Sequence, residues 1–272
     1  MEILIGIAAV LALAAVLLLV CGVRLRLSAV SYTLKSPKLA APLRLALLAD
    51  LHSGSYGEGQ CELLDALREG KPDAVLFAGD IIDNHGSEQP AWDLLEQVGR
   101  RYPCFYVTGN HEEYTKDAAR MKEKLRRCGV VPLEGGTVTV RLKGQTLLIG
   151  GADDPYRNEA GFAQALRRCK ERRDPAVYSI LLSHRPERVK AYRQSGFDLV
   201  VCGHAHGGQV RLPGLINGLF APGQGLFPRC AGGCYPLSPE TVMVVSRGLA
   251  KNHKLRVFNP PELVWIQLAP GK

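Results

Sequence analysis

The sequence predicts one α/β domain behind a single N-terminal transmembrane helix. Three observations carry this prediction: an uncharged apolar run at residues 3–23, alternating short apolar and amphipathic segments from residue 43 onward, and polar residues directly after several expected strands. The 272 residues suffice for one or two domains, and 46% of them are apolar. A net charge of +8 with only 22% charged residues excludes a disordered chain. Eight cysteines are too few for a disulfide-stapled miniprotein.

Residues 1–23 are predicted to form a membrane anchor. As a helix, the 21 uncharged residues 3–23 would span about 31 Å, the thickness of a bilayer's hydrocarbon core. A cleaved signal peptide would need a basic region before a shorter apolar stretch, whereas only Glu2 and the terminal amine precede this run. We therefore expect a retained, single-pass helix in the cell membrane.

The residues after the anchor predict its orientation. Five basic residues and no acidic one lie between Arg24 and Leu48. Because Lys and Arg near the end of a span stay in the cytoplasm, we expect the main domain on the cytoplasmic face. Residues 24–41 are predicted to be a basic juxtamembrane linker, either against anionic headgroups or simply solvated. The main domain is then expected at residues 42–272.

Each element of that domain follows from the apolar pattern. Short apolar runs predict buried strands, and their ranges are 43–48, 74–77, 104–107, 178–182 and 199–202. Amphipathic segments predict helices at 61–68, 92–100, 112–127 and 161–172, the third of them ending near Gly129. Two β-like runs, 137–141 and 145–149, flank Lys143-Gly144 and predict a hairpin. Further strands are expected at 242–245, 255–258 and 263–268, after a Gly- and Pro-rich functional loop at 203–236.

Polar residues gather where the expected strands end. Five strand ends are followed by Asp50-Leu51-His52, Gly79-Asp80, Gly109-Asn110-His111-Glu112, His184, and Gly203-His204-Ala205-His206-Gly207-Gly208. Five of the seven histidines of the chain belong to this set. Because α/β proteins bind ligands at the carboxyl ends of their strands, we expect these side chains to converge.

The donor set predicts a metal centre. Nitrogen and oxygen donors together suit Mn, Fe or Zn better than calcium, which prefers oxygen alone. In the segments Asp50-Leu51-His52 and His204-Ala205-His206, an extended backbone would point the two outer side chains to the same side. The groups exceed what one tetrahedral ion needs, so with one shared carboxylate they suit two ions about 3.5–4 Å apart.

The ordered blocks Asp-x-His, Gly-Asp-x-x-Asp, Gly-Asn-His-Glu, a lone His and Gly-His-x-His resemble the signature of the calcineurin-like metallophosphoesterases over about residues 43–270. The segments His206-Gly207-Gly208-Gln209-Val210 and Ser246-Arg247-Gly248 resemble its small membrane-anchored bacterial phosphodiesterases. The resemblance implies an α/β sandwich of two mixed sheets flanked by helices. It also implies two divalent metal ions, manganese first and iron or zinc as alternatives.

Residue by residue, the resemblance assigns Asp50, His52 and His206 to one metal ion. It assigns Asn110, His184 and His204 to the other, with Asp80 bridging the two ions. His111 would be the catalytic histidine and Asp83 the carboxylate that orients it. Glu112 is expected either behind the metal ligands or as an acidic residue in the first turn of a helix.

These residues predict hydrolysis of a phosphoester, most simply a phosphodiester or a pyrophosphate. A hydroxide that bridges the two metal ions would attack phosphorus, and His111 would protonate the leaving oxygen or stabilise its charge. The motifs address the phosphate and not its substituents. Anchoring beside a membrane favours a lipid-linked phosphodiester or pyrophosphate, and a nucleotide substrate stays open. A membrane-tethered scaffold that binds metal without turnover is one alternative, against which the pair His111 and Asp83 argues. A nuclease is another, but no basic groove with interleaved aromatic residues supports nucleic-acid binding. The sequence predicts no oligomeric state.

Overall fold

The computed structural model describes residues 22–23, 26–83, 86–115, 117–212, 214–251 and 255–271. The predicted anchor at residues 1–23 lies outside the described residues except for Gly22 and Val23. None of the helices in the described ranges has the length and apolar character needed to cross a bilayer.

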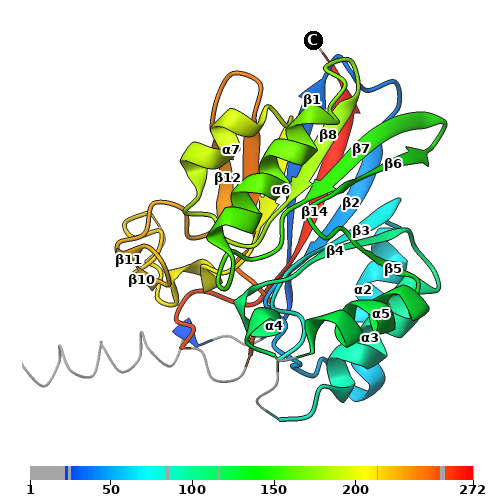
Figure 1. Ribbon diagram of the computed structural model, residues 1–272. Coiled ribbons are helices and arrows are strands. Elements are labelled where there is room, and N and C mark those ends of the chain that lie inside the picture. Colours follow the sequence, from blue (N-terminus) through cyan, green and yellow to red (C-terminus); the bar gives the residue numbers. More distant parts are fainter. Residues whose placement is uncertain are drawn as a thin grey trace, which may run out of the picture.

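Two mixed six-stranded sheets form the centre of the described part of the chain (Figure 1). The strands of the first sheet are β1 (Ser28–Ser36), β2 (Leu43–Leu48), β3 (Ala74–Ala78), β4 (Cys104–Val107), β5 (Val130–Pro132) and β14 (Glu262–Pro270), in the order β1-β14-β2-β3-β4-β5. The strands of the second sheet are β6 (Thr137–Leu142), β7 (Gln145–Gly151), β8 (Tyr178–Leu182), β9 (Leu199–Cys202), β12 (Gly233–Pro236) and β13 (Val242–Val245), in the order β12-β13-β9-β8-β7-β6. The hairpin β10 (Phe220–Ala221) and β11 (Gly225–Leu226) stands apart from both sheets.

The central strands of both sheets run parallel, which brings their carboxyl ends to one edge. In the first sheet β2, β3, β4 and β5 are parallel neighbours, while β14 is antiparallel to β2 and parallel to β1. In the second sheet β7, β8, β9 and β13 are parallel, and the edge strands β6 and β12 are antiparallel to their neighbours. The expectation of two mixed sheets is confirmed.

Helices cover the outer face of each sheet. The longer ones are α2 (Cys61–Gly70), α3 (Gln89–Gly99), α5 (Ala118–Arg127), α6 (Glu159–Glu171) and α7 (Val189–Ser195). Residues of α2, α3 and α5 share a buried cluster with the first sheet, and residues of α6 and α7 share one with the second. The described residues therefore stack in four layers, helices, sheet, sheet and helices, as Figure 1 shows.

Alternation along the strands accounts for this layering. In β2, Leu45 and Leu47 belong to the cluster between the sheets, whereas Ala46 and Leu48 pack against the helices. Because successive side chains of a strand point to opposite faces, a strand buried on both faces needs an unbroken apolar run. The sequence 43–48 supplies such a run and therefore occupies a central position in the sheet.

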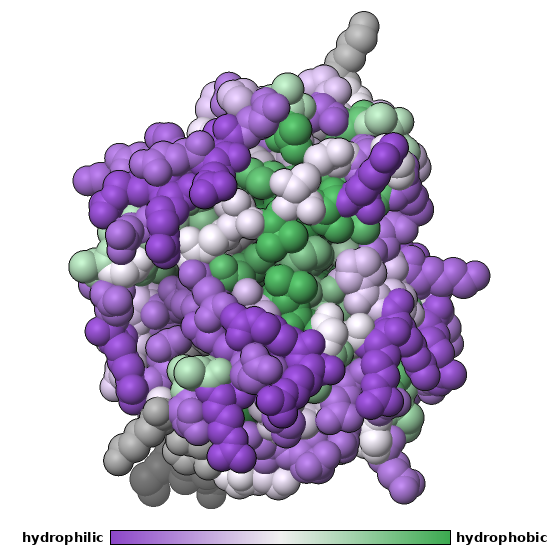
Figure 2. Space-filling view, turned by 45° about the vertical axis from the view of Figure 1, so that its right-hand side comes forward, coloured by the Kyte–Doolittle hydropathy of each residue, from purple (hydrophilic) through white to green (hydrophobic). Residues whose placement is uncertain are grey.

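Figure 2 views the molecule from the side on which β5 and β6 lie in Figure 1. A band of hydrophobic residues runs between hydrophilic margins on this face. β5 and β6 are the edge strands of the two sheets, and the partly buried Val138 and Val140 of β6 pack against the inter-sheet cluster. The apolar layer between the sheets thus reaches the molecular surface along this edge.

The structure differs from three of the expected elements. Ser28–Ser36, expected in a linker, is the edge strand β1, so the folded domain begins before residue 42. The helix expected at 112–127 is two helices, α4 (Asn110–Tyr114) and α5, because Thr115 takes an extended conformation and Asp117 caps α5 through Arg120 N. The strand expected at 255–258 is reduced to one bridge between Val257 and Val210, since the buried Arg256 turns its side chain onto neighbouring carbonyls.

The position of β1 predicts how truncation affects stability. A chain that lacks residues 1–41 loses β1, uncovers the edge of β14, and gives up the packing of Tyr32 and Leu34 on the inter-sheet cluster. Full burial of such a side chain contributes about 1.5–3 kcal/mol, and these two are partly buried. We therefore expect a melting temperature roughly 5–10 °C below that of a chain lacking only residues 1–25. Calorimetry on both chains measures the difference, and equal melting temperatures would show that β1 does not support the domain.

Candidate metal centre

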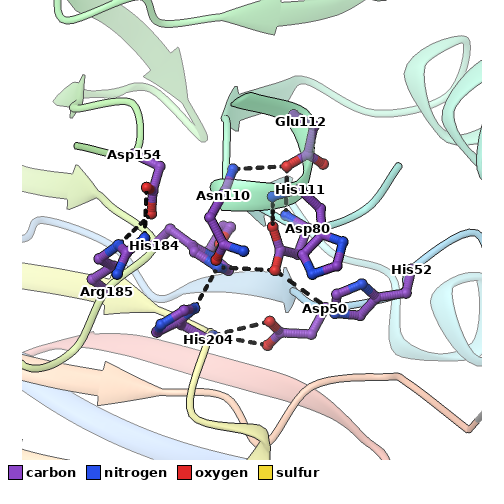
Figure 3. Close-up of polar contacts among 12 residues, drawn as sticks. Asp50, His52, Asp80, Asn110, His111, Glu112, Asp154, His184, Arg185 and His204 are labelled. Atoms are coloured by element: carbon purple, nitrogen blue, oxygen red, sulfur yellow. Dashed lines mark hydrogen bonds and ion pairs between the residues drawn. The ribbon is translucent and has the colours of Figure 1, made fainter. Parts of the chain in front are cut away.

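The predicted site residues lie together at the edge where the carboxyl ends of both sheets meet (Figure 3). The first sheet places Asp50 and His52 after β2, Asp80 and Asp83 after β3, and Asn110 and His111 at the start of α4. The second sheet places His184 after β8, and His204 and His206 after β9. All nine residues therefore form one cluster, although they come from five separate strand ends.

Three groups of side chains in this cluster have the spacing of a cation site, with ligand atoms within 4.8 Å of one another. The groups are Asp50, His52 and His206; Asp80, His184 and His204; and His52, Asp80 and His111. The first two groups contain the ligands that the family resemblance assigns to separate metal ions. Asp80 also belongs to the third group with His52, so its carboxylate lies between the two sets.

The contacts of Asp80 fix its carboxylate in this middle position. Asp80 Oδ1 accepts a hydrogen bond from the His111 backbone N–H at 2.9 Å. Asp80 Oδ2 lies 3.2 Å from His184 Nε2 and 3.7 Å from His52 Nε2. Burial alone would raise the pKa of Asp80, but the imidazole of His184 and its neighbours hold it well below the usual value. Asp80 is thus an anion that faces both groups of ligands.

Asp50 occupies a less favourable electrostatic position. It is fully buried, and burial raises the pKa of its carboxyl group despite nearby imidazoles and a hydrogen bond from the His204 backbone. A cation beside Asp50 would oppose this effect by stabilising the charged form. The burial of Asp50 therefore fits a metal ligand.

Hydrogen bonds behind the ligands orient their donor atoms. His184 Nδ1 lies 2.8 Å from the carbonyl oxygen of Ala78, which leaves Nε2 facing Asp80. Asn110 Nδ2 donates to Tyr114 Oη at 2.9 Å, while Asn110 Oδ1 is buried and has no hydrogen-bond partner among the described residues. Since buried acceptors are rarely left without a donor, this oxygen fits a bound cation.

Asp83 contacts two histidines rather than the one expected. Its Oδ2 lies 3.0 Å from His111 Nδ1 and 2.9 Å from His52 Nδ1, and the two rings meet edge to face with centroids 4.5 Å apart. Burial lowers the pKa of His111, while Asp80 and Asp83 oppose that shift. One carboxylate therefore orients both the expected catalytic histidine and an expected metal ligand, an arrangement that fixes the ring of a metal-binding histidine.

The backbone at the ligands corrects one expectation. Residues 50, 52, 204 and 206 were expected on extended exits, but all four, and Asp80 as well, have φ between 46° and 67°, in the left-handed region. L-residues adopt this conformation at a cost of about 1–2 kcal/mol each. Hydrogen bonds between the two loops, such as His52 N to Asp80 O at 2.9 Å, keep the turns in place. The side chains converge because the loops turn sharply and hold each other there.

Glu112 is a structural residue whose importance the sequence did not reveal. Its buried carboxylate accepts hydrogen bonds from four backbone N–H groups and from one hydroxyl, those of Asp80, Ile81, Ile82, Gly109 and Tyr106, at 2.6–3.0 Å. Burial and the charge of Asp80 raise the pKa of Glu112 to about 7. The available signal was its place in the first turn of a short helix, directly after Asn110 and His111.

Two glycines enclose the carboxylate of Asp50. A Cβ atom at Gly248, where φ is 75°, would lie 2.7 Å from Asp50 Cβ, and one at Gly203 would lie 2.7 Å from Asp50 Oδ2. The loop of Gly248 is held by the buried Arg256, whose guanidinium donates to the carbonyls of Arg247, Gly248 and Ala250 at 2.6–3.1 Å. No local sequence signal predicted this role of Arg256, because its partners lie six to nine residues away.

A pocket of about 350 Å³ opens at the cluster. Besides site residues, its walls include Tyr114, Tyr156, Arg185 and Pro222. Asp154 accepts two hydrogen bonds from Arg185, of 2.7 and 3.0 Å (Figure 3). This volume is within the range of small-molecule sites, so the pocket can admit a phosphate and part of its substituent.

Comparison with known proteins agrees with this geometry. The family model described as calcineurin-like phosphoesterase matches residues 43–208. The chain belongs to this family. Its members hydrolyse phosphoester bonds with divalent metal ions, and the matched range holds all nine residues of the cluster.

Several relatives share the family over most of this chain. An uncharacterised metallophosphoesterase of Campylobacter jejuni is 30% identical over 89% of this chain and 63% of its own length. Phosphodiesterase YaeI of Escherichia coli is 27% identical, over 84% of this chain and 83% of its own. A bovine transmembrane protein with a metallophosphoesterase domain is 29% identical, over 76% of this chain and 48% of its own. The chain thus spans about half to two thirds of the length of several relatives it matches.

Solved structures confirm the fold. The phosphopantetheinyl hydrolase PptH of Mycobacterium tuberculosis superposes with a TM-score of 0.50 at 13% identity, over 80% of this chain and 96% of that one. At this identity the likeness concerns the fold and not the substrate.

The network around Glu112 predicts a large loss of stability on a small chemical change. In Glu112→Gln an amide group faces two of the backbone N–H donors, and each buried donor left without an acceptor costs about 1–3 kcal/mol. We expect the free energy of unfolding to fall by roughly 2–4 kcal/mol in denaturant titrations. Glu113→Gln is the control, because Glu113 is only half-buried and accepts from the Thr108 hydroxyl. Equal losses in both variants would contradict the role of Glu112.

The close approach of Gly248 to Asp50 predicts an effect on metal binding. In Gly248→Ala the new methyl group would overlap Asp50 and displace its carboxylate, so we expect Mn²⁺ affinity to fall about 10- to 100-fold in calorimetric titrations. Gly144→Ala serves as the matched control, because Gly144 has a similar φ of 80° but no atom within 4 Å of its Cβ position. An unchanged affinity in Gly248→Ala would show that the position of Asp50 does not depend on this contact.

Proposed function

We propose that the chain is a membrane-anchored, metal-dependent phosphoester hydrolase that cleaves a phosphodiester or pyrophosphate at a dinuclear centre with a hydroxide nucleophile. The observation that carries this proposal is the pair of ligand groups on either side of Asp80, at the mouth of a pocket of phosphoester size. Residues 3–23 would hold the chain in the membrane, with the domain on the cytoplasmic face.

The ligands divide between two cations in this proposal. Asp50, His52 and His206 would hold one ion, and Asn110, His184 and His204 the other. Asp80 would be shared, since its Oδ2 faces His52 on one side and His184 on the other. When bound, two divalent ions supply positive charge for the phosphate and make hydroxide available near neutral pH. Mn²⁺ is our first choice for this mixed nitrogen and oxygen set, with iron and zinc as alternatives.

His111 is proposed as the proton donor for the leaving oxygen. It lines the pocket, its Nδ1 is directed to Asp83, and its Nε2 would donate the proton to the substrate. Asp83 favours the protonated ring and fixes its direction. General acid catalysis of this kind contributes about 10²–10⁴-fold to a rate.

The pair of His111 and Asp83 also favours an enzyme over a tethered metal-binding scaffold. A scaffold needs its metal ligands but has no use for an oriented imidazole beside them.

Arg185 and the ring of Tyr156, at the outer wall of the pocket, are placed to contact the substituent of the phosphate. The charge of Arg185 is largely balanced by Asp154, so the wall does not demand a second anionic group.

Two variants test the proposed chemistry. In the full chain reconstituted with Mn²⁺, we expect Asp80→Asn to abolish hydrolysis of bis(p-nitrophenyl) phosphate, because the shared carboxylate is lost. We expect His111→Ala to lower kcat about 10²–10⁴-fold while the bound Mn²⁺ content stays unchanged. Asp65→Asn, at an exposed ion pair with Arg68, is the control. Undiminished turnover in Asp80→Asn would reject the bridging role, and stoichiometric Mn²⁺ without hydrolysis in the unaltered chain would favour the scaffold.

A further inference from the structure

Most of the exposed large hydrophobic side chains among the described residues lie on one end of the molecule. Ten such side chains are exposed, and seven of them form what we call the apolar face: Val23, Leu212, Leu215, Phe220, Leu226, Phe227 and Leu255. Leu215 is 85% exposed, Leu226 67% and Phe227 63%. Contiguous exposed apolar residues on this scale mark an interaction surface rather than ordinary surface variation.

Backbone hydrogen bonds join the segments of the apolar face into one ladder. Phe220 pairs with Leu226 in the β10–β11 hairpin, and Phe227 N donates to Leu219 O at 2.8 Å. Leu219 N in turn donates to Val210 O at 2.9 Å, and Val210 forms a bridge with Val257. The segments that carry the exposed side chains are therefore neighbours in space, although they lie far apart in the sequence.

The same ladder contains the end of the apolar run of the sequence. Phe258 N donates to Gly22 O at 2.7 Å, and Gly22 and Val23 are the last two residues of the uncharged run 3–23. If that run crosses a bilayer, it leaves the bilayer next to residues 255–258 and therefore beside the apolar face. Because the apolar face lies beside the end of this run, a lipid bilayer suits the face better than a second protein does.

The charge of the segment agrees with a lipid surface. Residues 199–239 contain the cations Arg211 and Arg229 and no Asp or Glu. Arg229 is exposed, and Arg211 is half-buried beside Asn217. The carboxylate beside this segment, that of Glu187 next to Gly223, is half-buried and lies 3.7 Å from the guanidinium of Arg185. Apolar side chains flanked by cations are typical of segments that enter the headgroup region of anionic bilayers.

We propose that the apolar face lies in the interfacial region of an anionic phospholipid bilayer, as a second membrane contact beside residues 3–23. This inference rests on the anchoring part of the proposed function. It commits residues 209–212 and 214–227, part of the functional loop expected at 203–236, to contact with lipid.

The apolar face adjoins the mouth of the metal centre. β10 packs next to the turn His206–Gly208, and Pro222, directly after β10, lines the pocket together with His204 and His206. A phosphoester whose apolar part is embedded in the same bilayer would thus reach the pocket along this wall. We therefore infer that the substrate is an amphiphile, with its phosphate at the level of the headgroups.

Fluorescence quenching by lipid tests the contact directly. The full chain is reconstituted into vesicles of phosphatidylcholine and phosphatidylglycerol with brominated acyl chains, as the variants Leu215→Trp and Phe227→Trp. We expect the emission of the added tryptophan to be lost in brominated vesicles, above the background of the buried Trp92 and Trp265. Val131→Trp is the matched control, because Val131 is exposed on β5, outside the apolar face. Its emission should persist.

The absence of quenching at positions 215 and 227 in vesicle-bound protein would overturn the proposal. Intermolecular cross-linking would then assign the face to a second copy of the chain, and protection of both positions without cross-linking would assign it to residues 3–21. Quenching does not depend on turnover, so a protein that contacts lipid but hydrolyses no phosphoester would refute the proposed function and leave this contact standing.

A second measurement tests the amphiphilic substrate. In the triple variant Leu215→Ser, Leu226→Ser and Phe227→Ser we expect unchanged hydrolysis of soluble bis(p-nitrophenyl) phosphate and a lower rate on vesicle-borne phosphatidyl-p-nitrophenol. Val131→Ser should change neither rate. Equal rates on vesicles, or equal losses on both substrates, would show that the apolar face does not present the substrate.

Discussion

A single buried carboxylate, that of Glu112, connects two of the five loops that carry the metal centre. It accepts hydrogen bonds from the backbone of the loop after β3 and from Gly109 at the end of β4, so neither loop can move alone. Those loops carry Asp80, Asn110 and His111, and Asp80 in turn accepts from the backbone of His111. The positions of these groups are therefore set by main-chain contacts before any cation is considered, which is the preorganisation that a metal site requires.

The second requirement is the alignment of two sheets. His184, His204 and His206 follow strands of the second sheet, whereas the carboxylates Asp50, Asp80 and Asp83 follow strands of the first. The apolar cluster between the sheets, built from alternate residues of β2, β3, β8 and β9, holds these two halves at a fixed distance. Substitutions in that cluster would change the distance between the histidines and the carboxylates of the metal centre, because packed interiors transmit small displacements.

The sequence allowed the central strands of both sheets and the nine residues of the cluster to be predicted, because the strand ends are local features and the motifs are short. What it did not reveal depends on distant partners. Ser28–Ser36 alternates between half-buried and exposed positions and pairs with β14, more than 220 residues away, so its polar composition resembled a linker. The left-handed turns at Asp50 and His204 are held by other loops, and the burial of Arg256 depends on carbonyls outside its own segment. The roles assigned to the nine residues stay predictions.

The hydrogen bond between Phe258 and Gly22, together with the start of β1 at Ser28, leaves almost no slack between the end of the apolar run and the folded domain. If residues 3–23 span a bilayer, as proposed, this short connection would hold the domain at a nearly constant height and tilt, whereas a long linker would let it move freely above the membrane. An enzyme held at such a height would select among phosphoesters by how far their phosphates project from the membrane, so geometry would add a criterion of selection that the chemistry of the metal centre does not contain.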